Sequence, residues 1–349
     1  MVINNLPIGT IRIKSNLAPV IKTRTSWEKT SFNTDNIKEV VKLFKAHNNL
    51  NILLDSKNKN FLKGYLTPDN KIRGERINIL PNGEKLDKAF SLFSPHLTIH
   101  DQKTHNHWDV IYQNPNGKYA YLYTLDKIKN KKNKKYEHVK EFSKAIPTLE
   151  KNLLKALNNN ELMALPLYTL LKTHMRIGNE IYYKLNGHKG LTTLKKQDIN
   201  INNPEVKFNF IGKDGVPQET IEIFPDVYIL NLTNKLTPLK KQEFAFTDEH
   251  GNLLRDTHFE SAFERYCGIR FYPHIVRSYY ATKTVEDFLK KNKKPEKKEI
   301  NELYNQIAEK LGHKKFSKKE NTWKPSHTVT VAHYISPKLV EKINKIVGK

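Results

Sequence analysis

The sequence has almost no cysteine and no long apolar run. Cys267 is the only cysteine among 349 residues, which excludes a disulfide framework and a cysteine-based zinc site. No stretch approaches the roughly 18 apolar residues of a membrane-spanning helix, and residues 1–16 lack the basic-then-apolar order of a signal peptide. These absences predict a soluble, intracellular protein with no membrane contact.

Acidic residues are scarce relative to basic ones. The chain has 36 Asp and Glu against 60 Lys and Arg, which gives a formal net charge of +24 and a pI near 9.7. The excess is spread over the whole length. General solubility rarely requires so much charge, whereas a polyanionic partner would neutralise it, so the composition favours nucleic acid binding.

Several cofactor signatures are also missing. The sequence contains no Walker loop, no dinucleotide fingerprint and no Asp/Glu cluster for magnesium, so we expect neither a cofactor nor a metal ion. The dense histidine group His96, His100, His105 and His107 is the one alternative. Only Asp101 and Asp109 stand at matching ligand intervals, and the segment resembles a loop entering a strand, so we interpret these histidines as surface or core residues.

The first third of the chain predicts a β-rich domain, residues 1–126. Short apolar runs alternate with Pro-Asn and Pro-Asp turn signals at 68–70, 81–83 and 115–117, and one helix is expected around Ile37–Phe44. A lysine-rich segment, 127–138, follows as a basic linker. It is either plain solvated chain or a hinge that crosses a phosphate backbone.

Residues 139–349 predict a mostly α-helical domain with a small β-hairpin, so the fold class is α+β. One helix has its apolar face at Val139–Leu157 with an expected kink at Pro147, and a second spans about Glu161 to Leu185 and carries Arg176 near its end. Arg176 either faces a ligand or forms an ion pair with Glu180 one turn on.

The hairpin and the later segments supply further polar groups. Val206, Phe208 and Phe210 alternate with polar residues before a Gly-Lys-Asp-Gly turn, which places Lys213 at an exposed tip. There the ammonium either meets solvent or enters a DNA groove. Further helices are expected around Phe259–Tyr266, His274–Phe288 and Ile300–Leu311, and a lysine-rich loop of about twenty residues separates His313 from 331–337.

Six short motifs follow one another along the second half of the chain. They are R-I-G-x-x-x-Y at 176–182, G-L-T-T-L at 190–194, G-K-D at 212–214, H-x-x-R at 274–277, L-G-H at 311–313 and A-x-Y-I-x-P at 332–337. Their order resembles the type IB DNA topoisomerases, in particular the small form of poxviruses, giant viruses and many microbes. The resemblance covers roughly residues 105–345, and the order of the motifs is more specific than any one of them.

This resemblance implies a mechanism. Tyr334 would attack a backbone phosphorus to form a 3′-phosphotyrosyl link, while Arg176, Arg277 and His313 hold the nonbridging oxygens and Lys213 protonates the leaving 5′-oxygen. It also implies a monomer that closes on double-stranded DNA as a C-shaped clamp, with residues 1–126 as a clamp domain. Further DNA contacts are expected from Tyr182, Thr192, Lys195, Lys196 and His274.

The sequence departs from the family pattern in two places. The interval from His313 to Tyr334 is about twice that of the compact viral form, with 314–324 as an apparent insertion, and residues before about 105 match poorly. The nucleoid or cytoplasm is the expected compartment, or the particle and host cytoplasm for a viral protein.

The same residues allow other interpretations. Tyr182, Tyr183, Tyr279 and Tyr280 are rival nucleophiles, but aromatic residues of amphipathic helices more often pack in a core or contact DNA. Site-specific tyrosine recombinases, or integrases, share the catalytic residue types, but lack the block at 190–194 and have a small helical N-terminal part. A non-enzymatic DNA-binding protein is disfavoured because every catalytic residue type is present.

Overall fold

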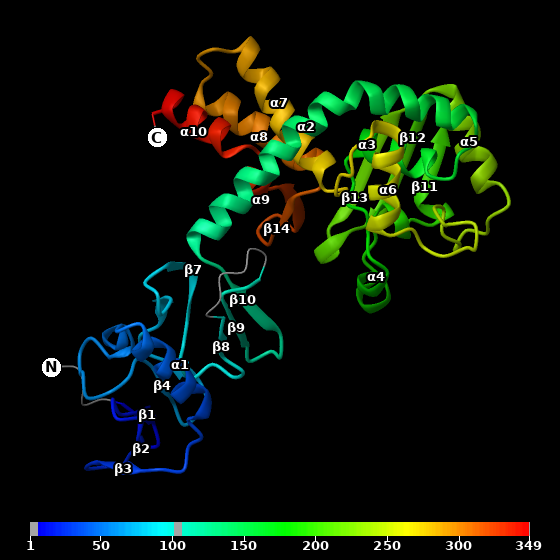
Figure 1. Cartoon of the computed structure of the whole chain (residues 1–349). Coiled ribbons are helices and arrows are strands. Elements are labelled where there is room, and N and C mark those ends of the chain that lie inside the picture. Colours follow the sequence, from blue (N-terminus) through cyan, green and yellow to red (C-terminus); the bar gives the residue numbers. More distant parts are fainter. Residues whose placement is uncertain (1–5, 101–106, 349) are drawn as a thin grey trace. The chain divides into compact units, whose positions relative to one another are not determined.

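The computed structural model describes residues 6–100 and 107–348 and divides the chain into two compact units, Met1–Lys134 and Lys135–Lys349. The architecture mixes helices and sheets, as the sequence predicts (Figure 1). The segment 127–138 is not an irregular linker. It lies inside the long helix α2, Leu125–Asn158, which contains Pro147 and passes from one unit into the other.

The first unit is β-rich around one helix. A five-stranded sheet has the order β3-β2-β1-β4-β5, a three-stranded sheet the order β10-β9-β8, and β6 pairs with β7. The bounds are β1 Ile11–Ile13, β2 Pro19–Lys22, β3 Trp27–Lys29, α1 Asp35–Ala46, β4 Tyr65–Leu66, β5 Ile72–Arg73, β6 Ile77–Ile79, β7 Lys85–Phe90, β8 Thr98–Ile99, β9 Val110–Gln113 and β10 Tyr119–Leu122.

The predicted helix and turns of this unit are confirmed. In α1 the residues Ile37, Val40, Val41 and Phe44 are buried, because their 3.6-residue spacing turns them to one side. The segments at 68–70, 81–83 and 115–117 form the turns β4–β5, β6–β7 and β9–β10.

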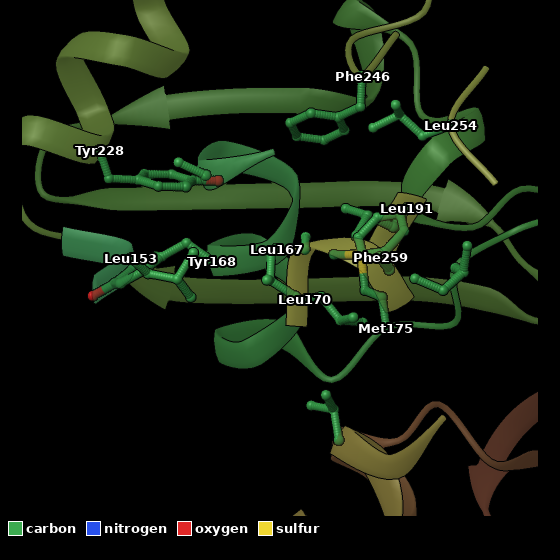
Figure 2. Packing of buried hydrophobic residues seen from close by; sticks show 14 of the residues in the cluster. Leu153, Leu167, Tyr168, Leu170, Met175, Leu191, Tyr228, Phe246, Leu254 and Phe259 are labelled. Carbon is green, nitrogen blue, oxygen red and sulfur yellow. The ribbon is translucent and has the colours of Figure 1, made fainter. Parts of the chain in front are cut away.

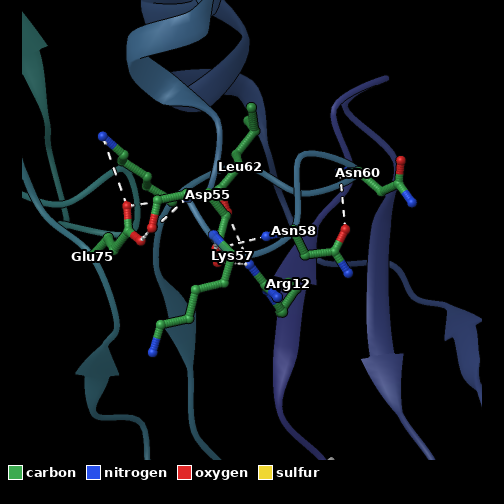
Figure 3. Close-up of polar contacts among 9 residues, drawn as sticks. Arg12, Asp55, Lys57, Asn58, Asn60, Leu62 and Glu75 are labelled. Atoms are coloured by element: carbon green, nitrogen blue, oxygen red, sulfur yellow. Dashed lines mark hydrogen bonds and ion pairs between the residues drawn. The ribbon is translucent and has the colours of Figure 1, made fainter. Parts of the chain in front are cut away.

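A buried ion pair organises the loop at 55–62. Arg12, which is 4% exposed, pairs with Asp55 (Figure 3). The Arg12 guanidinium also lies 4.2 Å from the centre of the Phe61 ring. Asp55 also accepts the backbone amide of Lys57 at 2.8 Å. Because a carboxylate bonded to a cation and to backbone amides has little freedom, it fixes the start of this loop.

The second unit combines a three-stranded antiparallel sheet, in the order β11-β12-β13, with helices. The bounds are α3 Ala164–Thr173, α4 Glu180–Asn186, β11 Ile199–Asn202, β12 Glu205–Ile211, β13 Pro217–Ile223, α5 Asp226–Leu236, α6 Asp256–Cys267, α7 Ile275–Lys291, α8 Lys297–Lys310, β14 Lys314–Ser317, β15 Thr322–Pro325, α9 His327–His333 and α10 Pro337–Ile346.

Two apolar clusters hold this unit together. In the larger one, side chains of α2, α3, α5 and α6 meet, among them Leu153, Leu167, Tyr228 and Phe259 (Figure 2). The smaller one joins α7, α8 and α10 and includes Tyr334 and Ile335. The candidate nucleophile is therefore part of a packed core.

Two predictions for this unit are wrong. The helix expected from Glu161 to Leu185 ends at Thr173, because His174 takes a left-handed conformation with φ of 55°, and Arg176 lies in the extended connection to α4. The loop expected after His313 instead forms the hairpin β14–β15 and the helix α9. Tyr334 therefore directly follows a helix.

Candidate active site

One pocket of the second unit brings together four of the five predicted catalytic residues. It has a volume of about 320 Å³, and Arg176, Lys213, Arg277 and His313 all line it. Among the described side chains that line it, Asp214 is the only acidic one. A pocket with this balance of charge attracts an anion.

Arg277 is the buried centre of this pocket. Its side chain is 2% exposed and donates to the carbonyl of His174 at 2.6 Å and to that of Leu311 at 2.8 Å. Burial lowers the pKa of Arg277 to about 10, against the opposing effect of Tyr334, so the guanidinium stays charged at neutral pH. Its buried Nε–H has no hydrogen-bond partner among the described residues.

His313 is held between Arg277 and a threonine. The guanidinium donates to Nε2 at 3.1 Å, so Nδ1 carries the proton of the neutral ring and donates to the Thr330 hydroxyl at 2.8 Å. Burial, and then the charge of Arg277, lowers the pKa of His313 to about 3. To donate to a phosphate oxygen, the ring must change tautomer or gain a proton.

Tyr334 lies against this pair, although it does not line the pocket itself. Its ring centre is 4.9 Å from that of His313 and 5.2 Å from the Arg277 guanidinium carbon. The Tyr334 hydroxyl is also a hydrogen-bond partner that raises the pKa of Arg277. The phenol oxygen is thus beside the arginine that would hold the attacked phosphate.

Three consecutive carbonyls fix the backbone around Tyr334. Lys135 Nζ donates to the carbonyl of His333 at 2.6 Å, Thr282 Oγ1 to that of Tyr334 at 3.3 Å, and the Tyr136 hydroxyl to that of Ile335 at 2.7 Å. The donors come from α2 and α7. Because each bond restrains a peptide next to the phenol, the side chain is presented from a rigid support.

Arg176 is placed by the Gly-Leu-Thr-Thr block. Leu191 N–H donates to the Arg176 carbonyl at 2.9 Å, and Thr192 N–H to the Ile177 carbonyl at 2.7 Å. A Cβ on Gly190 would lie 2.5 Å from the Gly178 nitrogen, so only glycine permits this approach. The motifs at 176–182 and 190–194 are one structural unit that presents the arginine.

The guanidinium of Arg176 has no hydrogen bond or ion pair with any described residue. The alternative pair with Glu180 is not formed, since that carboxylate bonds to Lys184 at 2.7 Å. The Lys213 ammonium is likewise exposed and has no partner in the described part of the chain. Two unpaired cations therefore face the pocket.

A glutamine joins the tip of the β12–β13 hairpin to the loop of His313. The Gln218 amide donates to the Gly312 carbonyl at 3.2 Å. A Cβ at Gly312, where φ is +67°, would lie 1.8 Å from the Gln218 oxygen, and one at Gly212 would lie 2.9 Å from its Cγ. Gln218 thus fills the space between Gly212 and Gly312, and the positive φ of Gly312 favours glycine there.

The predicted DNA contacts differ in their surroundings. Tyr182 is 59% exposed on α4, whereas Thr192 is 1% exposed and its hydroxyl donates to the Ile177 carbonyl at 3.0 Å. Lys195 donates to Gln242 at 3.0 Å, and Lys196 to the Leu239 carbonyl at 2.8 Å. Thr192 and Lys196 thus have structural bonds in this state, and their contact with DNA stays a prediction.

His274 lies beside the nucleophile. Its ring stacks 5.8 Å from Tyr272 and 6.5 Å from Tyr334, centre to centre. Burial, followed by the charge of Arg277, lowers the pKa of His274 to about 3. It is therefore a neutral ring next to the phenol, and its role toward DNA stays a prediction.

Sequence reasoning missed several groups that position the site. These are Lys135, Tyr136, His174, Gln218 and Thr330. His174 and Thr330 lie within or near motifs that the sequence displays. Gln218 and Tyr136 have no local signal, because each acts on a residue 94 or 199 positions away.

The histidine group of the first unit forms a ring cluster. His100 and His107 are 4.6 Å apart between ring centres, and His107 is 4.6 Å from Trp108. The described residues contain no group of three or more His, Cys, Asp or Glu side chains arranged to hold a metal ion. Asp101 and His105 lie outside the described residues.

None of the described helices combines the length and apolar character needed to cross a bilayer.

Part of the chain is similar to known DNA topoisomerases. DNA topoisomerase 1B of Acanthamoeba polyphaga mimivirus is 29% identical over 143 residues, which are 39% of this chain and 42% of that protein. The chain thus matches less than half the length of this relative. Among solved structures, the XerH site-specific recombinase bound to difH substrate, in a pre-cleavage complex, has 18% identity and a TM-score of 0.35, with 57% of this chain and 52% of that chain covered.

A second XerH complex, post-cleavage on palindromic difH substrate, has 16% identity and the same TM-score of 0.35, with 58% of this chain and 51% of that chain covered. The model of the eukaryotic DNA topoisomerase I catalytic core matches residues 126–343. That range is more than half of the chain and contains the pocket and Tyr334. The chain belongs to the DNA topoisomerase I family, of which it carries the catalytic core.

Proposed function

We propose that this protein is a type IB DNA topoisomerase, which relaxes supercoiled DNA by cutting one strand, letting it rotate and resealing it. The observation that carries the proposal is the contact of the Tyr334 phenol with Arg277 and His313 at a pocket that also holds two unpaired cations, Arg176 and Lys213. A phosphodiester is an anion of suitable size and charge for such a pocket.

In the cleavage step the Tyr334 oxygen attacks the phosphorus. One O–P bond forms to tyrosine, the P–O5′ bond breaks, the phenol loses its proton and the 5′-oxygen gains one. The product is a 3′-phosphotyrosyl link that keeps the free energy of the broken ester. Attack by the 5′-hydroxyl therefore reseals the strand without ATP.

The basic side chains of the pocket have two different roles in this step. Arg277 and Arg176 hold the nonbridging oxygens as charge builds in the five-coordinate transition state, and His313 joins them when its ring changes tautomer and Nε2 carries the proton. Lys213 donates a proton to the leaving 5′-oxygen, since its ammonium is exposed at the pocket and has no protein partner in the described chain. Three cations and a histidine thus supply the electrostatic stabilisation from the chain itself.

The proposal extends to the partner and the state of assembly. The substrate is double-stranded DNA, which the net charge of +24 attracts, and the protein acts as a monomer that closes on it as a C-shaped clamp. It acts where such DNA lies, in a microbial cytoplasm or nucleoid, or in a viral particle or host cytoplasm.

Incubation with supercoiled plasmid in EDTA without ATP tests the proposal. Wild-type protein should relax positive and negative supercoils and, when stopped with detergent, leave a covalent protein–DNA adduct. Tyr334→Phe should bind DNA with unchanged affinity and form no adduct, whereas Tyr280→Phe should behave as wild type. Relaxation that requires magnesium or ATP, or an adduct formed by Tyr334→Phe, would contradict the mechanism. Exchange of strands between two duplexes would instead identify a recombinase.

A further inference from the structure

The hairpin β14–β15 is not explained by the proposed reaction. It occupies the interval between His313 and α9, with Lys314, Lys315, Phe316 and Ser317 opposite Pro325, Lys324, Trp323 and Thr322 (Figure 1, labelled β14). An isolated two-stranded hairpin is marginally stable in water. Its stability therefore depends on its contacts with the rest of the second unit.

The base of the hairpin is anchored at the pocket. Lys314 Nζ donates to the carbonyl of Pro217 at 3.1 Å, and Ser326 N–H donates to the carbonyl of His313 at 2.8 Å. Lys314 and Ser326 also line the pocket. The two strands therefore extend from the edge of the cavity that would hold the cleaved phosphate.

The hairpin carries an uncompensated positive charge. Residues 314–325 contain five lysines and one acidic residue, Glu320, which pairs with Lys324. Lys315 lies directly across from Lys324, and like charges opposite each other destabilise a strand pair. Lys315, Lys318 and Lys319 are exposed and have no ion pair among the described residues. An anionic partner would remove this repulsion.

The other face of the hairpin presents aromatic rings. Phe316 and Trp323 pair across the strands with ring centres 5.5 Å apart, and Phe316 remains 41% exposed. The neighbouring pair Lys315 and Lys324 points to the opposite face, so the hairpin carries lysines on one face and aromatic rings on the other. Nucleic-acid-binding surfaces use both kinds of group, because lysines meet phosphates while rings contact sugars or bases.

We propose that β14–β15 is a DNA-binding arm that contacts backbone phosphates within about four nucleotides of the cleaved one. The distance follows from a strand rise of about 3.3 Å per residue over four residues, against about 3.4 Å per nucleotide along one DNA strand. The proposal rests on the proposed function, because it takes the neighbouring pocket as the site of the cleaved phosphate.

The test removes the charges of the arm alone. The variant Lys315→Gln/Lys318→Gln/Lys319→Gln is compared with Lys293→Gln/Lys294→Gln/Lys298→Gln, which removes three exposed charges from the α7–α8 connection and the first turn of α8. Both are made in a Tyr334→Phe background, so that binding is measured without cleavage. The probe is a duplex whose cleavage position has been mapped from the wild-type adduct, with single phosphates replaced by neutral methylphosphonates.

The arm variant should reduce the slope of log affinity against log salt by about one for each phosphate that the arm no longer neutralises. It should also lose the wild-type sensitivity to at least one methylphosphonate within four nucleotides, while the control variant keeps it. Lys315→Arg/Lys318→Arg/Lys319→Arg should behave as wild type. An arm variant that matches the control in slope and in methylphosphonate sensitivity would overturn the proposal.

Failure of the proposed function gives a different result. In that case wild-type protein forms no adduct on any duplex, irrespective of the hairpin. Folding of the arm variant is checked by its melting temperature, which should not fall, since removing the charge of Lys315 relieves the repulsion with Lys324.

Discussion

Arg277 and Lys213 line the same pocket, yet their surroundings suit them to different tasks. Arg277 is fully buried and fixed by two carbonyls and His313, so it has a defined position and no freedom to release a proton. Lys213 stands at an exposed turn where Asp214 has a left-handed φ of 63°. A fixed charge suits transition-state binding, and a mobile ammonium suits proton transfer.

The first residue-scale prediction separates these tasks chemically. Lys213→Ala should lose cleavage of a normal 5′-oxygen leaving group and regain much of it on a 5′-bridging phosphorothiolate, because a thiolate departs without a proton. Arg277→Ala should lose roughly 10² to 10³ in rate on both substrates, as expected for one preorganised donor. Single-turnover cleavage measures both. Rescue of Arg277→Ala but not of Lys213→Ala would reverse the assignment.

The sequence predicts the basic residues of the pocket, but it does not predict the residues that hold them in position. Arg176, Lys213, Arg277 and His313 belong to the motifs whose order carries the family resemblance, and these four residues line one pocket. The sequence does not indicate the role of Gln218, because its side chain fills a space between Gly212 and Gly312 that exists only in the folded chain. Long-range geometry of this kind has no local pattern.

At the scale of elements, tertiary contacts override local periodicity in two places. The apolar pattern from 161 to 185 continues through His174, but the helix ends there, and the carbonyls of Arg176 and Ile177 accept hydrogen bonds from Leu191 and Thr192. Backbone bonds to that block replace those of a helix. After His313, lysine content favoured a loop, whereas the cross-strand pair of Phe316 and Trp323 stabilises a hairpin.

The prediction at this scale concerns the support of the nucleophile. Tyr136→Phe removes the bond from α2 to the Ile335 carbonyl and leaves a buried acceptor unsatisfied, at a cost of about 1 to 3 kcal/mol. Loosening the peptide beside Tyr334 should slow single-turnover cleavage by about tenfold or more while DNA affinity stays unchanged. The matched control is Tyr280→Phe, whose hydroxyl does not contact this segment in the described structure.

A merely structural role for Tyr136 would give a different pattern. The melting temperature would fall and cleavage would recover fully at lower temperature, where the variant is folded. Persistence of the rate defect in folded protein is therefore the decisive observation. Equal cleavage rates for Tyr136→Phe and wild type would show that the bond does not position the phenol.

At the scale of the whole molecule, the excess of positive charge is accompanied by neutral, buried histidines in the second unit. Its pocket concentrates arginine and lysine, and three histidines near it are kept neutral by burial: His174, His274 and His313. The burial is clearest for His174. The centre of its ring lies 4.2 Å from that of Tyr280, and its buried Nδ1 has no hydrogen-bond partner among the described residues. Protonating any of them would add charge beside Arg277.

The last prediction is that acid destabilises the protein well above the range where carboxylates titrate. Burial lowers the pKa of these histidines to about 3, from 6.5 in the unfolded chain, so the unfolded state binds more protons between those values. The free energy of unfolding should therefore rise with pH up to about 6.5 and then level off, with a slope of about 1.4 kcal/mol per pH unit for each histidine.

Urea unfolding from pH 4.5 to 8 measures this slope. His174→Asn, which tolerates the left-handed backbone, should reduce the slope, whereas exposed His138→Gln should not. A His174→Asn slope equal to that of wild type would show that this ring is not held neutral by the fold.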